Sequence, residues 1–85
     1  MTYRIEFKRS AKKELAAVDP SMRQRIANAI DALASDPRPA GCTKMAGFEQ
    51  AWRIRIGDYR VVYEITDEVL LVLVVAVAHR REVYR

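Results

Sequence analysis

Cysteine and histidine are almost absent from this 85-residue sequence, which contains only Cys42 and His79. A single cysteine allows no internal disulfide, which fits a reducing compartment such as the cytoplasm. One cysteine and one histidine also fall short of the ligand set of a usual zinc site. The two could form a nucleophile pair, but Cys42 follows the Pro/Gly-bounded connection PRPAG, and we expect it to fill space.

Long hydrophobic runs are scarce as well. The longest, Val69 to Ala78, has ten residues, whereas a helix needs about 20 to span a bilayer. The amino-terminal stretch MTYRIEFKRS lacks the apolar core of a signal peptide. We therefore expect residues 1–85 to form one soluble, cytoplasmic domain that does not enter a membrane.

Positive charge is in excess, because 15 lysines and arginines outnumber 11 acidic residues and give a net charge of +4. A surplus of this sign suits an anionic partner such as a nucleic acid, without identifying it. The positions of the charges along the chain are therefore more informative than their sum.

An arginine-rich hairpin is predicted by the stretch AWRIRIGDYRVVYE, Ala51 to Glu64. A two-residue Gly57-Asp58 turn of type II′ would place Arg55 opposite Arg60. Because side chains alternate along a strand, both arginines share one face with Arg53. Like charges placed opposite one another destabilise a sheet by roughly 0.2–1 kcal/mol, so we expect this face to have a function. The other face carries Trp52, Ile54, Ile56, Tyr59, Val61 and Tyr63.

The order of the elements predicts an α+β fold, β-α-α-β-β-β(-β), with a two-helix hairpin packed on one face of a small antiparallel sheet. Asp19 and Pro20 favour the start of a helix that ends near Ser35. The unbroken apolar run Val69–Ala78 is typical of a strand buried on both faces, inside the sheet. The other expected elements are a strand at Thr2–Phe7, a helix at Ala11–Val18 capped by Ser10, and a possible strand at Thr43–Ala46.

Basic side chains from the hairpin and from the sequence HRREVYR are expected to converge beside the arginine-bearing face. A guanidinium group can bind a phosphate through two parallel N–H···O hydrogen bonds. An aromatic ring among such groups can stack on a base. This combination suits a phosphodiester ligand. The alternative is a solvated basic face that Glu64 and Glu82 partly neutralise. The candidate residues are Arg53, Arg55, Arg60, Arg80, Arg81, His79 and Tyr84.

The motifs WRIRIGDYRVVYEI and HRREVY, with a long Val/Leu strand between them, resemble the RelE branch of the RelE/ParE superfamily of bacterial toxins. The resemblance covers nearly the whole chain. It implies the toxin half of a type II toxin–antitoxin pair, an endoribonuclease that cuts the mRNA codon in the ribosomal A site. It also implies that no metal and no cofactor are needed.

The resemblance carries the family's paired basic residues onto Arg53 and Arg55, and its later arginines and terminal tyrosine onto Arg60, Arg80 and Tyr84. Arginine transfers protons poorly because its pKa exceeds about 12, so Arg55, Arg60 and Arg80 are expected to hold the phosphate. Arg53 and Arg81 would position the substrate. Tyr84 could stack on a base, orient the 2′-OH or act as a base.

Two further site residues and two departures accompany this assignment. His79 is a candidate acid or base because histidine is the side chain whose charge, when unperturbed, changes near neutral pH; otherwise it is a strand-end residue that faces solvent. Lys12 and Lys13 belong to a basic run that could contact RNA backbone or simply face solvent. The paired basic residues are often lysine in the family, and many relatives continue into a further helix beyond the position of Arg85.

The resemblance also implies partners. We expect an acidic, RelB-like antitoxin, a ribosome with mRNA in its A site, and contact with operator DNA only through the antitoxin complex. Two other functions share this fold or surface: a ParE-like inhibitor of DNA gyrase that is not a nuclease, and a catalytically weak RNA-binding homologue.

Overall fold

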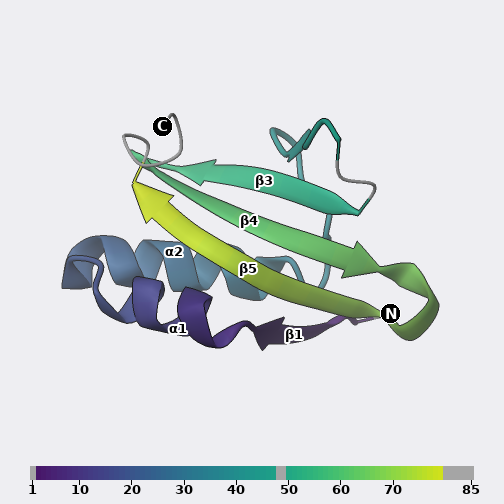
Figure 1. The fold of residues 1–85 in the computed structure, drawn as a ribbon, viewed down its shortest axis with the longest axis horizontal. Coiled ribbons are helices and arrows are strands. Elements are labelled where there is room, and N and C mark those ends of the chain that lie inside the picture. The colour runs from purple at the N-terminus through teal and green to yellow at the C-terminus, as the bar shows by residue number, and fades with distance from the viewer. Residues whose placement is uncertain (1, 48–49, 80–85) are drawn as a thin grey trace.

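Five strands and two helices form two layers in the computed structural model, which describes residues 2–47 and 50–79. The strands are hydrogen-bonded in the order β1-β5-β4-β3-β2, and both helices lie on the same side of the sheet (Figure 1). The elements are β1 (Arg4–Phe7), α1 (Arg9–Ala16), α2 (Pro20–Ala32), β2 (Thr43–Lys44), β3 (Ala51–Ile56), β4 (Tyr59–Thr66), the short 3-10 helix η1 (Asp67–Val69) and β5 (Leu71–His79).

The α+β architecture with a helical hairpin on one sheet face confirms the predicted fold class, with one correction. The sheet is mixed, because β1 pairs with β5 in parallel, from Arg4 opposite Leu71 to Phe7 opposite Val74. A parallel pair needs a long connection between its strands. Here that connection comprises both helices and the strands β2, β3 and β4, so no local pattern signals the direction of β1.

The predicted hairpin register is confirmed. Ile56 lies opposite Tyr59, and Arg55 lies opposite Arg60. Gly57, at the first position of the turn, has a φ of +59°, the left-handed value that primed hairpin turns require. A Cβ atom at Gly57 would come within 2.9 Å of Met22 Cε, so the turn lies close to α2.

The helix starts were predicted unequally well. α2 begins at Pro20 with Asp19 as its N-cap, as expected, although it ends at Ala32, a little before Ser35. α1 begins at Arg9 with Lys8 as its N-cap, two residues before the predicted start. The Lys8 N–H donates to the Val74 carbonyl, so the backbone leaves β1 at Lys8 and turns at once into the helix.

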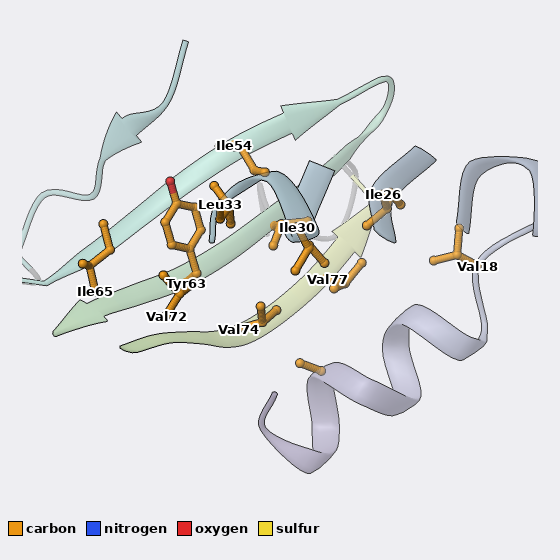
Figure 2. Close-up of a cluster of buried hydrophobic side chains, with 12 residues drawn as sticks. Val18, Ile26, Ile30, Leu33, Ile54, Tyr63, Ile65, Val72, Val74 and Val77 are labelled. Carbon is orange, nitrogen blue, oxygen red and sulfur yellow. The ribbon is translucent and has the colours of Figure 1, made fainter. Parts of the chain in front are cut away.

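The core lies between α2 and the inner face of the sheet (Figure 2), with Ile26, Ile30 and Leu33 against Tyr63 and Val61. The Tyr63 hydroxyl donates a 2.7 Å hydrogen bond to the Pro37 carbonyl. Burial raises the pKa of Tyr63, because the interior disfavours a phenolate. The other buried core side chains include Ala11, Val18, Ile54, Ile65, Val72, Val74 and Val77.

β5 lies inside the sheet, between β1 and β4, as its sequence predicted. The prediction that β5 is buried on both faces was wrong. Val72, Val74 and Val77 are buried, whereas Leu71 and Leu73 on the other face are only half-buried. The reason is that the helices cover one side of the sheet. The ladder between β4 and β5 also shifts by one residue at Val75, which forms a bulge.

Among the described residues, no helix combines the length and the apolar character needed to cross a bilayer.

Candidate nucleic-acid interface

Three arginines lie on the sheet face opposite the helices. Arg55 and Arg60 are register partners, and Arg53 lies two residues before Arg55 on β3. We call Arg53, Arg55 and Arg60 the arginine face. Arg55 is exposed and Arg53 is half-buried. Arg60 is only 6% exposed, so the expectation that all three would be displayed to solvent was wrong for Arg60.

The position of β4 accounts for part of this difference. β4 is the middle strand, and Arg60 is flanked by Arg55 on β3 and by Ala78 on β5. The carboxylate that β4 itself supplies on this face is Glu64, four residues away, or about 13 Å at about 3.3 Å per residue. Arg55 and Arg60 therefore lie next to the turn, which also carries Asp58, on a surface that suits phosphate oxygens.

His79 lies on the other side of the sheet. It is the last residue of β5 and pairs with Tyr59, whereas its neighbour Ala78 pairs with Arg60. Because successive side chains of a strand point to opposite faces, His79 faces away from Arg60. Its ring meets the Tyr59 ring edge-on, with centroids 5.2 Å apart. The side chain borders a cavity of about 190 Å³ between the end of the sheet and the helices, not the arginine face.

Lys12 and Lys13 are exposed on α1, in the helical layer. The structure therefore does not bring them together with the arginine face, and they form a second basic surface. Arg80, Arg81 and Tyr84 lie outside the described residues, which end at His79.

Two arrangements had not been recognised from the sequence. At the end of the sheet far from the Gly57 turn, the Asp67 carboxylate accepts hydrogen bonds from Tyr3 at 2.6 Å and from Arg38 at 2.9 Å. The Arg38 guanidinium also lies 5.3 Å from the centre of the Trp52 ring. The hydrogen bond from Arg38 lowers the pKa of Asp67, and the bond to Asp67 raises the pKa of Tyr3. These residues are far apart in sequence, so no local pattern signals them.

The second arrangement involves Glu14, the acidic residue of an otherwise basic helix. Its Oε1 accepts a 2.9 Å hydrogen bond from the Val77 backbone N–H. An acid within the run KRSAKKE was the available signal. In the described ranges 2–47 and 50–79, no group of three or more His, Cys, Asp or Glu side chains is arranged to hold a metal ion.

Comparison with known proteins places this geometry in a family context. Residues 5–84 match a family model described as the ParE toxin of the type II toxin–antitoxin system parDE. The mRNA interferase toxin RelE of Escherichia coli is 28% identical over 88 aligned positions, covering 99% of this chain and 92% of that protein. Toxin RelG of Mycobacterium tuberculosis is 28% identical over 86 positions, covering 100% and 99%.

Solved structures of RelE proteins have the same fold as this chain. The archaeal RelE–RelB complex of Pyrococcus horikoshii contains a chain with a TM-score of 0.83 and 26% identity, covering 94% of this chain and 97% of that one. A mutant of E. coli toxin RelE in the free state has a TM-score of 0.82 and 27% identity, covering 99% and 92%.

Proposed function

Because this chain belongs to the ParE toxin family of type II toxin–antitoxin systems, we propose that it is a toxin that stops translation by cutting mRNA in the ribosomal A site. The observation that supports this most directly is the arginine face, where Arg55 and Arg60 stand side by side on β3 and β4. The name of the E. coli relative, mRNA interferase toxin RelE, supports an endoribonuclease.

The proposed chemistry is attack of a 2′-OH on the neighbouring phosphate, which yields a 2′,3′-cyclic phosphate and a 5′-OH. This reaction needs a base, stabilisation of the charge at phosphorus and a proton for the leaving oxygen. Arg55 is exposed and can contact a phosphate directly. Arg60 is buried, and a fixed charge in a water-poor setting stabilises a developing anion more strongly than a solvated one.

The remaining roles fall to residues around this face. Arg53 would position the substrate, with Arg81. Arg80 would join Arg55 and Arg60 on the phosphate, and Tyr84 would stack on a base or take part in proton transfer. His79 is the weaker candidate for proton transfer, because the register places it on the opposite side of the sheet from Arg60. With so few proton-transfer groups, cleavage should depend on the ribosome to align the RNA.

A partner is part of this proposal. Several structural relatives are RelE chains in complex with RelB antitoxins. We propose that this toxin, in the cytoplasm, is held by an acidic antitoxin whose carboxylates cover the arginine face. Operator DNA would be contacted through that complex. Saturating antitoxin should abolish cleavage, and a complex that still cuts would contradict this arrangement.

The test is toeprinting on programmed ribosomes with an empty A site, with wild-type protein beside Arg55→Ala and Arg80→Ala. Both variants should lose the new mRNA 3′ end in the A-site codon. Arg25→Ala is the matched control, because Arg25 is an exposed arginine on α2, away from the arginine face. It should cut like wild type.

If wild-type protein makes no cut, the nuclease proposal fails. The second candidate, favoured by the ParE description of the family model, is then inhibition of DNA gyrase, measured by supercoiling. Binding of RNA without cleavage in the same reactions would instead indicate a catalytically weak RNA-binding homologue.

A further inference from the structure

β5 is longer than its parallel neighbour β1 and extends beyond the end of it. The ladder between β1 and β5 ends at Phe7 opposite Val74, and the Lys8 N–H donates a last 2.9 Å bond to the Val74 carbonyl. β5 then continues to His79 beside α1, which follows β1 directly (Figure 1). Backbone groups on that side of Val75–His79 therefore need partners other than a strand.

Glu14 provides one such partner. From α1, its Oε1 accepts the Val77 N–H at 2.9 Å, between residues 63 positions apart in sequence. A carboxylate forms stronger hydrogen bonds with an N–H than a neutral acceptor does. The side chain therefore replaces, at one point, the missing strand partner of β5.

The end of β5 borders a cavity on the helix side of the sheet. The cavity of about 190 Å³ is lined by Glu14, Val77, Tyr59 and His79, together with Ala17 and Val18. On one side the end of β5 is paired with β4, from Val61 opposite Val77 to Tyr59 opposite His79. On the side that β1 no longer covers, Glu14 holds it by accepting the hydrogen bond from the Val77 N–H. The cavity gives this side of the strand end room to shift if the hydrogen bond to Glu14 is lost.

The end of β5 also borders the arginine face, on the other side of the sheet. Ala78, between Val77 and His79, is the register partner of Arg60. A shift of the strand end would therefore displace the part of β5 that flanks Arg60.

We propose that Glu14 is a positioning residue for RNA cleavage: by accepting the Val77 N–H hydrogen bond, it fixes the end of β5 that flanks Arg60. This inference rests on the proposed nuclease function. Misplacement of catalytic groups by about 1 Å can cost about 100-fold in rate, so a residue that never touches RNA can control turnover.

The experiment compares Glu14→Ala with Glu14→Gln. Both variants remove the same negative charge, but glutamine keeps a carbonyl oxygen at the Oε1 position. Two quantities are measured in each: hydrogen exchange of the Val77 amide in the free protein, and the single-turnover cleavage rate at saturating ribosomes, with the ribosome affinity determined separately. An effect of charge alone would appear equally in both variants.

We expect Glu14→Ala to lose protection of the Val77 amide and to cut about 10- to 100-fold more slowly, with unchanged affinity for the ribosome. Glu14→Gln should restore most of both. If the alanine variant unfolds, Glu14→Asp serves instead, because it keeps the charge but is one methylene too short. It should show the same pair of losses.

Each contrary result has its own meaning. A wild-type protein that does not cut overturns the proposed function, and this inference with it. Wild-type cutting with an equal rate in Glu14→Ala or Glu14→Asp overturns this inference alone. Equal slowing in the alanine and glutamine variants, with the Val77 amide still protected in both, also overturns it, because charge rather than the hydrogen bond would then be responsible.

Discussion

At the scale of single residues, Arg55 and Arg60 are neighbours across the hairpin, yet their side chains differ greatly in solvent exposure. Arg55 is exposed, and Arg60 is 6% exposed. A like-charge pair on a sheet costs stability, but the same pair is suited to a polyanion. Stability and binding are therefore expected to respond in opposite directions when the exposed charge of Arg55 is removed.

Replacing Arg55→Gln should raise the free energy of unfolding by about 0.2–1 kcal/mol, while RNA cleavage falls. Urea unfolding measures the gain, which should shrink in 1 M salt, where the Debye length is about 3 Å. Arg55→Lys keeps the charge and should show no gain. A glutamine variant less stable than wild type would argue against charge repulsion at this pair.

The cluster around Asp67 predicts a pH dependence. The hydrogen bonds from Arg38 and Tyr3 lower the pKa of Asp67 below its usual 3.8. A carboxyl whose folded pKa is depressed stabilises the protein above its unfolded pKa, and that contribution is lost as the pH falls through the folded value. Asp67→Asn should therefore lower the Tm at pH 7, and its difference from wild type should fade below about pH 4.

Comparing thermal unfolding of the two proteins at pH 7 and pH 3 isolates Asp67 from other titrating groups, because those groups are common to both. A difference in Tm of the same size at both pH values would show that the loss comes from packing rather than from the ionised carboxylate.

At the scale of elements, the β3–β4 turn is held against α2 through Gly57. A residue other than glycine would face both a φ of +59° and the nearby Met22 Cε. The left-handed conformation alone costs roughly 1–2 kcal/mol for an L-residue. Gly57→Ala should cost more than this in wild type and less in a Met22→Ala background, as measured by urea unfolding.

Gly47→Ala is the matched control for this prediction. Gly47 has a φ of +83°, but a Cβ there would meet nothing within 4 Å. Its replacement should show the conformational cost alone. If Gly57→Ala costs no more than Gly47→Ala, the contact between the turn and Met22 contributes nothing.

The elements also show which features a sequence can predict. The register of β3 and β4 was predicted because it depends on a two-residue turn and on side-chain alternation, both of them local. The parallel direction of β1 and the burial of Arg60 depend on strands far away in sequence. The lone acid in the basic run marks Glu14, but its partner Val77 depends on β1 ending before β5 does, which no local pattern shows.

At the scale of the whole molecule, two of the basic surfaces described above lie on opposite sides of the sheet. The arginine face lies opposite the helices, and Lys12 and Lys13 are exposed on α1. The two surfaces cannot bind the same few phosphates. We expect the arginine face to act on mRNA and the α1 lysines to contact ribosomal RNA backbone.

The double variant Lys12→Ala/Lys13→Ala should therefore weaken ribosome binding and reduce the slope of log affinity against log salt by about 1–2. The cleavage rate at saturating ribosomes should stay unchanged, in contrast to Arg55→Gln. Binding titrations over a range of salt concentrations test this. An unchanged slope would leave the α1 lysines as an ordinary solvated surface.

The parallel pairing of β1 with β5 has a consequence for synthesis. Arg4 pairs with Leu71, so during synthesis β1 stays without a ladder partner until β5 has been made. Domains fold as units, and pairing between such distant segments is slow. A nascent chain that has produced all of the arginine face therefore still lacks the sheet that organises it. The proposed cleavage of mRNA would therefore begin only after β5 has been made.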